Sequence, residues 1–309
     1  PPPPPAVSLI EVGPRDGLQS ESLFVPTPLK LQLIESLLAA GHTRVEATSF
    51  VSPKWIPQFS DANDVMSALS PAPGVELSVL TPNLQGAAAA ASHAATSAMS
   101  VFGAASEGFT AKNINCTISE SISRFGKVAA FAAEKGIPVR GYVSCVAGCP
   151  YQGAVPHEAV VRVYAAMREM GVGEVSLGDT IGTGTPEDVS ALLAKIVAVE
   201  GSAAPVAVHF HDTHGSALAN ILRSLDHGVT KIDAAVAGLG GCPYAGGGAT
   251  GNVATEDVVY MLEGMGVSTG IDLEKLVLAG RQVTEFLGTE TRSKAGGAIY
   301  RRMVKEGRA

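Results

Sequence analysis

The sequence predicts one α/β domain with a (β/α)8 barrel fold (a TIM barrel) and an extra C-terminal helix. Short apolar runs alternate with longer runs of helical spacing along the whole chain, and eight such pairs fit into about 260 residues. The 35 glycines suit the many tight turns that such a fold requires. An open doubly wound sheet is the alternative, but no Gly-x-Gly-x-x-Gly motif follows the first apolar run.

The predicted strands are short apolar runs, as expected for parallel strands that are covered on both faces. They span residues 7–12, 44–47, 75–80, 98–102, 139–144, 174–177, 206–209 and 231–236.

The predicted helices are longer segments with apolar residues at helical spacing, and Pro186 stands near the start of one of them. Residues 103 to about 119 are expected to form a long connection before a helix that ends near Lys135. The other helices span residues 29–40, 61–69, 84–93, 156–170, 186–199, 217–227, 253–264 and, as the extra one, 272–287.

Domain boundaries follow from composition. Residues 7–290 contain no linker and no break in composition, so we expect a single domain. Residues 1–6 are proline-rich and predict a disordered polyproline II arm. Residues 291–309 are polar, include Gly296 and Gly297, and predict a mobile tail.

Charge and cysteine usage exclude several classes of partner. The net charge of −7 and the lack of a long basic run argue against nucleic acid or an anionic membrane. No run of 18 apolar residues predicts a membrane span, and the N-terminus lacks a signal-peptide pattern. The four cysteines match neither a zinc site nor a disulfide framework, so we expect a cytoplasmic protein.

A metal site is predicted where the strand 206–209 ends. His209 and His211 point to the same side of the strand and can bind a divalent ion together, although two structural histidines are the alternative. In a barrel, Asp16 and Asn252 share their rim and supply a third and a fourth ligand. This mixed set of nitrogen and oxygen atoms suits Mg²⁺ or Mn²⁺. The alternative for Asp16 is a turn residue before Gly17.

Further polar residues at the strand ends are candidates for catalysis. Arg15 can stabilise an oxyanion, or it can form a surface ion pair with Asp16. Glu46 and Asp179 are acidic candidates, with roles as hydrogen-bond acceptors or helix caps as the alternative. Cys242 lies in a glycine-rich stretch and is either a proton donor or an incidental loop cysteine. The polar residues expected to bind substrate are Gln19, Ser49, Tyr142 and Ser176.

Several of these stretches together resemble the 3-hydroxy-3-methylglutaryl-CoA (HMG-CoA) lyase family. The resemblance extends over about residues 7–287, while the glycine-rich loop is one glycine longer than the family pattern and His214 stands in place of a tyrosine. The matching motifs are EVGPRDGLQ (11–19), TSFVSPKW (48–55), FGAASE (102–107), RGYVSC (140–145), SLGDTIG (176–182) and GLGGCPY (238–244) with Asn252.

The resemblance implies a metal-dependent TIM-barrel lyase that cleaves HMG-CoA to acetoacetate and acetyl-CoA, a step of leucine degradation and ketone-body formation. It implies a homodimer or a larger homo-oligomer with an acyl-CoA substrate. It places Asp16, His209, His211 and Asn252 on the metal ligands. It places Arg15, Glu46, Asp179 and Cys242 on catalytic residues.

The residues suggest a retro-Claisen mechanism. Asp179 or His209 takes the proton of the substrate's tertiary hydroxyl, Arg15 stabilises the resulting enolate, and Cys242 returns a proton to carbon. The cationic residues considered for the CoA phosphates are Lys54, Lys112 and Arg140. The alternatives are a lyase for a longer-chain 3-hydroxyglutaryl-CoA, a Claisen-type synthase similar to 2-isopropylmalate or homocitrate synthase, and a metal-binding barrel that serves as a scaffold.

Overall fold

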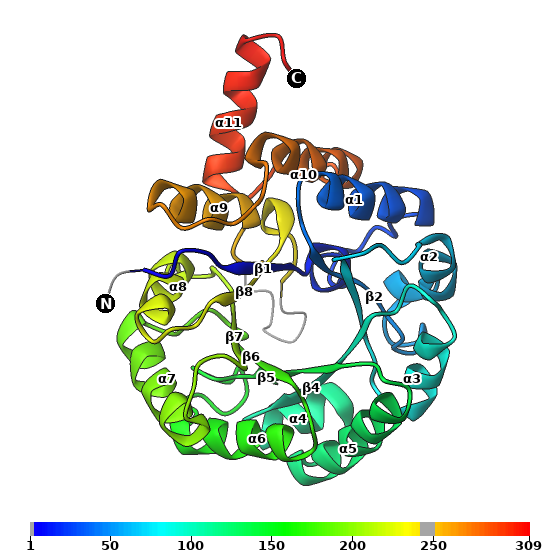
Figure 1. Cartoon of the computed structure of the whole chain (residues 1–309), viewed down its shortest axis with the longest axis vertical. Helices are drawn as coiled ribbons and strands as arrows, with labels where there is room; N and C mark the ends of the chain where they lie inside the picture. Colours follow the sequence, from blue (N-terminus) through cyan, green and yellow to red (C-terminus); the bar gives the residue numbers. More distant parts are fainter. Residues whose placement is uncertain (1–2, 242–250) are drawn as a thin grey trace.

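The parallel strands β1 to β8 close into a barrel in sequence order, with β1 paired to both β2 and β8. The structure, a computed structural model, describes residues 3–241 and 251–309. Seen along the barrel, the helices form a ring outside the strands (Figure 1). The predicted (β/α)8 barrel is therefore confirmed. The strands are β1 (Ser8–Glu11), β2 (Arg44–Ser49), β3 (Glu76–Leu80), β4 (Ala98–Ala104), β5 (Val139–Ser144), β6 (Glu174–Asp179), β7 (Val206–Phe210) and β8 (Lys231–Ala234).

The helices lie close to the predicted segments, apart from two that the sequence analysis did not contain. These two are α4, inside the expected long connection, and α11, inside the expected tail. The helices are α1 (Thr27–Ala39), α2 (Ala62–Ala68), α3 (Leu84–Ala91), α4 (Glu107–Ile114), α5 (Ile118–Glu134), α6 (His157–Glu169), α7 (Pro186–Glu200), α8 (Ala217–Asp226), α9 (Thr255–Gly264), α10 (Leu273–Leu287) and α11 (Lys294–Lys305), with short helical turns η1 (Gly13–Gly17), η2 (Pro57–Phe59) and η3 (Val236–Gly238).

Helix α4 escapes sequence analysis because it is short and buries little. Of its eight residues, Phe109 and Thr110 are buried. Its start is fixed by a tertiary network: the Ser106 hydroxyl accepts a hydrogen bond from the Phe109 amide and donates to the Gln152 side chain. Hydrophobic periodicity therefore gives no signal for this helix.

The two chain ends also differ from the expectation. The tail forms α11, which Ser293 caps at its start and which buries Ile299 and Met303 against Val277 of α10. In Figure 1, α11 extends outward from the ring beyond α9 and α10. At the other end, Ala6 pairs with Ser268, so the predicted disordered arm is ordered where it meets β1.

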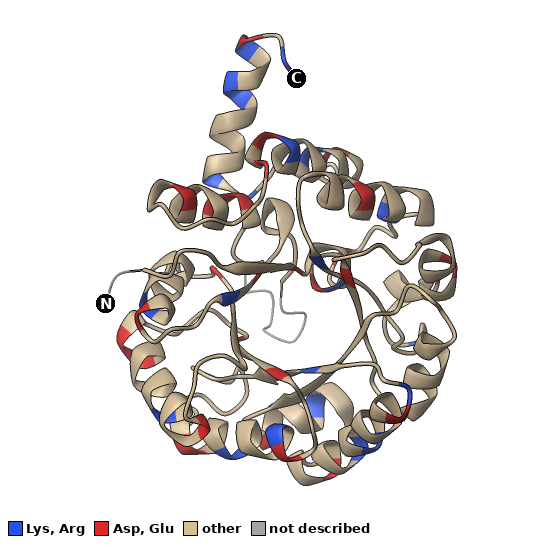
Figure 2. Cartoon of the chain, in the orientation of Figure 1, with Lys and Arg blue, Asp and Glu red and all other residues tan. Residues whose placement is uncertain are grey.

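Alternate residues of the strands build two different environments. Apolar side chains such as Val45, Val101 and Val208 are fully or almost fully buried in the main core. Charged residues of β2, β5, β6 and β8 form a connected set of ion pairs: Glu174 binds Arg44, Arg140 and Lys231. Figure 2 shows charged positions on the strands as well as on the outer helices.

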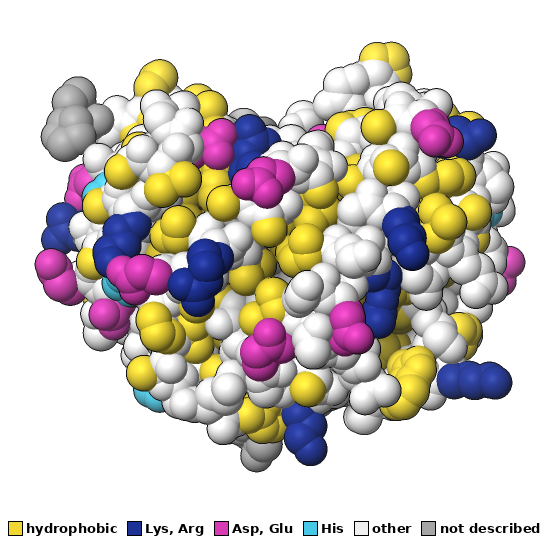
Figure 3. All heavy atoms as spheres, turned by 90° about the horizontal axis from the view of Figure 1, so that it is seen from below, with side chains coloured by type: hydrophobic (Ala, Val, Ile, Leu, Met, Phe, Trp, Pro, Cys, Tyr) yellow, Lys and Arg dark blue, Asp and Glu magenta, His cyan; other side chains and the backbone are white. Residues whose placement is uncertain are grey.

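The outer surface carries no extended region of a single charge on the face in Figure 3, where Lys, Arg, Asp and Glu are interspersed with apolar side chains. None of the described helices is long and apolar enough to cross a membrane.

Candidate active site

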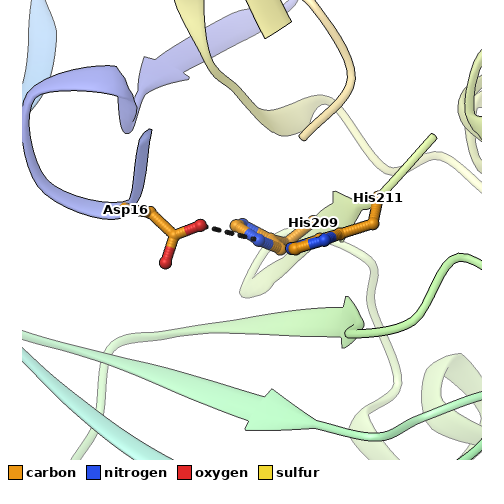
Figure 4. Close-up of side chains that lie close together, drawn as sticks. All are labelled: Asp16, His209 and His211. Carbon is orange, nitrogen blue, oxygen red and sulfur yellow. Dashed lines mark ion pairs between the residues drawn. The ribbon is translucent and has the colours of Figure 1, made fainter. Parts of the chain in front are cut away.

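The two predicted histidines lie where β7 ends, on the rim formed by the carboxyl ends of the strands. Both are buried, and their ring centroids are 5.5 Å apart. Nδ1 of His209 lies 3.2 Å from Oδ2 of Asp233 on β8, and Nε2 lies 3.8 Å from Oδ2 of Asp16. Asp233 thus fixes the ring of His209 and turns Nε2 toward Asp16 (Figure 4).

Asp16 reaches this point because β1 continues into the π-helical turn η1. The amides of Arg15, Asp16 and Gly17 all donate to the carbonyl of Val12. A Cβ at Gly17 would lie 2.9 Å from Cβ of Leu239, so the turn requires glycine there. The EVGPRDG motif therefore builds a tight turn that presents two adjacent charged side chains at the barrel mouth.

Asp16, His209 and His211 fit a divalent metal ion. One ligand atom from each lies within 4.8 Å of the others, whereas bonds of about 2.1 Å around one ion hold neighbouring ligand atoms roughly 3 Å apart, so small side-chain movements would complete the site. Burial alone would raise the pKa of Asp16, but Arg15 and the two histidines outweigh it and hold this pKa well below its usual range. Asp16 is therefore ionised and available as an anionic ligand.

Asn252 lies beside this group, as predicted. His211 and Asn252 form an isolated β-bridge, and the amide Nδ2 donates to Oδ2 of Asp16 over 2.8 Å. Rotating the side-chain amide by 180° turns its oxygen to the same point. The structure thus brings together all four residues that the sequence predicted as ligands.

Arg15 is buried at the floor of the site, in a fixed orientation. Its Nε donates to Glu46 and its Nη1 to Asp16, both over 2.5 Å, while Nη2 donates to no described residue. Tyr142 donates its hydroxyl to Glu46 and packs its ring 5.3 Å from the Arg15 guanidinium. Burial opposes the charge, but Glu46 and Asp16 raise the pKa of Arg15 above its ordinary value. Among the described residues, Nη2 is thus the guanidinium nitrogen without a hydrogen-bond partner.

Behind these residues lies a set of charges from which the sequence analysis named Arg140 alone, and as a candidate for the CoA phosphates. Arg140 donates to Asp233, Glu174 and the Tyr142 hydroxyl. Arg140 is only 3% exposed, so it is too buried to contact the CoA phosphates, the role considered for it from the sequence. One sequence pattern could have revealed this set: Arg140, Glu174 and Asp233 are charged residues inside apolar strand segments.

Three other predicted residues lie just behind the site. Ser176 donates to Asp233, and the Ser49 hydroxyl accepts from the amide of Val51. Asp179 accepts hydrogen bonds from the amides of Thr183 and Gly184, and burial raises its pKa despite these bonds. None of the three lines the cavity described next.

A cavity of about 560 Å³ opens above the candidate ligands. Its walls include Gln19 and Tyr142, two of the residues expected to bind substrate, together with Ser144 and Thr180. Trp55, which is 83% exposed, also lines it. Of the cations considered for CoA, Lys112 lines the cavity, and Arg124 lines it as well. The cavity therefore combines a charged floor with a cationic and aromatic outer part.

Cys242 and the three glycines at 246–248 lie outside the described residues. His214 is described: its Nδ1 lies 2.7 Å from the carbonyl of Gly182, so it supports the neighbouring loop.

A closed (β/α)8 barrel with a buried arginine beside two histidines, an aspartate and an asparagine on its carboxyl rim defines a class, the metal-dependent barrel enzymes. Within that class, the chain belongs to the HMGL-like family, whose model matches residues 6–283. The family resemblance drawn from the motifs is confirmed.

The relatives are similar over most of this chain. A mitochondrial hydroxymethylglutaryl-CoA lyase from Arabidopsis thaliana is 54% identical over 97% of this chain and 64% of its own length. The mitochondrial hydroxymethylglutaryl-CoA lyase of Gallus gallus is 53% identical over 96% of this chain and 99% of its own length. A lyase from Mus musculus with 50% identity is named cytoplasmic, so the relatives occur in two compartments.

Solved structures agree with this placement. The hydroxymethylglutaryl-CoA lyase of Pseudomonas aeruginosa has a TM-score of 0.93 and 47% identity, covering 97% of this chain and 99% of its own. An HMG-CoA lyase from A. baumannii, in complex with coenzyme A and 3-methylmalate, has a TM-score of 0.90 and 34% identity over 95% of each chain.

Proposed function

We propose that this chain is a divalent-metal-dependent lyase that cleaves HMG-CoA to acetoacetate and acetyl-CoA. The observation that carries the proposal is the Arg15 guanidinium beside the candidate metal ligands, held by Glu46 and Asp16 and with Nη2 unpaired among the described residues. The names of the relatives and the coenzyme A bound to one of them support an acyl-CoA substrate.

We assign Asp16, His209, His211 and Asn252 to a Mg²⁺ or Mn²⁺ ion, which would act as a Lewis acid toward the substrate's oxygens. Asp233 holds the proton on Nδ1 of His209 and keeps the Nε2 lone pair available. Since a single lone pair cannot bind a metal and take a proton at once, we assign His209 to the metal.

Arg15 stabilises the acetyl-CoA enolate that forms when the substrate is cleaved. When the carbon–carbon bond breaks, negative charge develops on the thioester oxygen of the departing acetyl-CoA enolate, and Nη2 of Arg15 is the donor placed to stabilise it. Glu46 and Tyr142 keep the guanidinium oriented. The hydroxyl proton of the substrate passes to solvent at the open mouth of the cavity, and Cys242 remains our proposed proton donor to carbon. Gln19 lines the cavity as a proposed substrate contact.

For Asp179 we propose a supporting role, because both of its carboxylate oxygens accept backbone amides of the 180–184 loop. Ser49 likewise supports Val51, which lines the cavity, and Ser176 supports Asp233, the partner of His209. A cytoplasmic location, a role in leucine degradation and a homodimeric state are further proposals, and light scattering of the purified protein tests the last.

The decisive test is to incubate the purified protein with HMG-CoA and Mg²⁺ and to measure acetoacetate and acetyl-CoA. We expect equal amounts of both products, loss of activity with EDTA, and recovery with Mn²⁺. Parallel reactions with longer 3-hydroxyglutaryl-CoA analogues, and with acetyl-CoA plus 2-oxo acids, test the alternative lyase and synthase activities. A folded, metal-bound protein that releases no acetoacetate contradicts the proposal.

A further inference from the structure

Arg292 lies in the turn between α10 and α11 and contacts residues 237–240, the segment that follows β8. The backbone amide of Arg292 donates to the carbonyl of Ala237 over 2.9 Å. Its Nη1 donates to two further carbonyls of that segment, those of Gly238 over 3.2 Å and Gly240 over 2.5 Å. A residue of the C-terminal region thus contacts three nearby carbonyls that follow β8.

The segment that Arg292 contacts has an unusual backbone. Ala237, Gly238 and Gly240 have φ angles of +58°, +66° and +108°, all in the left-handed region. A left-handed backbone is energetically costly for Ala237. Because this stretch is neither a regular helix nor a strand, its carbonyls lack the hydrogen-bond partners that those structures provide. A charged donor shared by two of these carbonyls compensates for the missing backbone partners.

The same segment holds Asn252. The carbonyl of Leu239 accepts the backbone amide of Asn252 over 3.4 Å, a bond that is the same in either orientation of the side-chain amide. A Cβ on Gly240 would lie 2.7 Å from the side-chain nitrogen of Asn252, so residues 238–240 pack directly against this amide group. The position of the Asn252 amide therefore depends on where residues 238–240 lie.

Gly251 completes the contact between Arg292 and this segment. A Cβ on Gly251 would lie 2.1 Å from the carbonyl oxygen of Gly238 and 2.6 Å from Nη1 of Arg292. The backbone just before Asn252 is thus packed directly against the guanidinium and the carbonyl that it binds. Arg292 touches the chain on both sides of the segment 242–250, next to a candidate ligand.

Arg292 is itself held in place by the start of α11. Asp257 of α9 accepts the Ser293 hydroxyl over 2.8 Å and the Ala295 amide over 2.7 Å. The neighbouring residue is therefore tied to the barrel, which limits the freedom of the Arg292 side chain.

We infer that Arg292 is a positioning residue for the metal site: it orders residues 238–240 and 251 and so places the Asn252 side chain beside Asp16. The inference rests on the proposed function, because it takes Asn252 as a metal ligand. It makes the C-terminal turn part of the machinery that sets metal affinity, although Arg292 contacts none of the three ligand side chains Asp16, His209 and His211.

The test measures Mn²⁺ binding to the metal-free protein by electron paramagnetic resonance, without substrate. We expect Arg292→Ala to raise the Kd for Mn²⁺ at least about tenfold, as loss of a residue supporting a metal ligand commonly does. Added guanidinium at millimolar concentration should recover part of the affinity. Arg301→Ala, which removes an exposed cation from α11, should bind Mn²⁺ like the unchanged protein.

The His211→Ala variant separates the possible outcomes. If His211→Ala loses Mn²⁺ while Arg292→Ala binds it as Arg301→Ala does, the role of Arg292 is rejected and the metal site stands. If His211→Ala binds Mn²⁺ normally, the metal site is rejected and the inference with it. Should Arg292→Ala not fold, Arg292→Met, which keeps the length of the side chain and removes the donor, is judged by the same tenfold threshold.

Discussion

At the scale of single residues, Arg15 links the stability of the barrel to its chemistry. It neutralises the fully buried Glu46 and also lines the cavity. Removing the guanidinium therefore has two consequences that an experiment must separate. One is the loss of the proposed donor to the reacting oxygen, and the other is a buried carboxylate left, among the described residues, with the Tyr142 hydroxyl alone.

We predict that Arg15→Gln reduces turnover by a factor of at least ~10² and also lowers stability by about 3 kcal/mol. The double variant Arg15→Gln/Glu46→Gln should regain most of the stability but none of the turnover. Steady-state kinetics and urea unfolding measure the two effects, with Arg162→Gln, exposed on α6, as the control. Near-normal turnover in either variant would refute the role of Arg15.

At the scale of elements, the loop between β6 and α7 shows how a predicted catalytic residue is built into the structure. Asp179 ends β6, and its carboxylate accepts the amides of Thr183 and Gly184. Its backbone carbonyl accepts the amide of His211, so the loop also supports the end of β7. The Asp179 side chain thus stabilises the local backbone on which a candidate ligand stands.

We predict that Asp179→Ala lowers the free energy of unfolding by about 1 to 3 kcal/mol, because it leaves two amides without an acceptor. Asp179→Asn keeps an acceptor oxygen and should lose less stability. Denaturant unfolding and kcat distinguish this role from that of a base. Full stability of Asp179→Ala, combined with a large loss of kcat, would instead support Asp179 as the proton acceptor.

The two helices absent from the sequence analysis were missed for the same physical reason. Helix α11 carries Gly296 and Gly297, which are poor helix formers, and is held by Asp257 and by apolar contacts to α10. Helix α4 is fixed at its start by Ser106 and Gln152. Long-range contacts decide both helices, and local sequence patterns do not contain them.

At the scale of the whole molecule, two buried carboxyls give the barrel a pH-dependent stability. Burial raises the pKa of Glu11 to about 7 and that of Glu256 to about 8. Both accept backbone amides of the segment after β8: Glu11 on β1 accepts the amide of Val236, and Glu256 on α9 accepts that of Ala237. Since the folded-state pKa values are raised, their contribution to stability is complete below about pH 4.5 and is lost as pH rises through about 7 to 8.

We predict that Glu256→Gln flattens this dependence. Between pH 5 and pH 9 the unchanged protein should lose stability relative to Glu256→Gln by on the order of 1 to 3 kcal/mol. Urea unfolding of both proteins across this range measures the difference in their free energies of unfolding. Groups that titrate in both proteins, such as His42, contribute equally to both and cancel in this difference. Parallel stability profiles would show that Glu256 does not titrate in this range.

The sequence alone determined the barrel, its strands and the identity of the four candidate metal ligands. Strand and helix periodicities are local properties of the chain, and the EVGPRDG and His209–His211 motifs place polar groups at strand ends, where any barrel gathers them. The family assignment follows from the same motifs and is confirmed by the match over residues 6–283.

Only the tertiary structure decided how those residues are supported. The pairing of Asp233 with His209, the burial of Arg140 between β6 and β8, and the contact of Arg292 with Gly238 and Gly240 join residues 24 to 93 positions apart. Such contacts depend on barrel closure and on where α11 packs. A charged residue in an apolar strand becomes part of a site when folding places its partner across the barrel, and no local pattern encodes that distance.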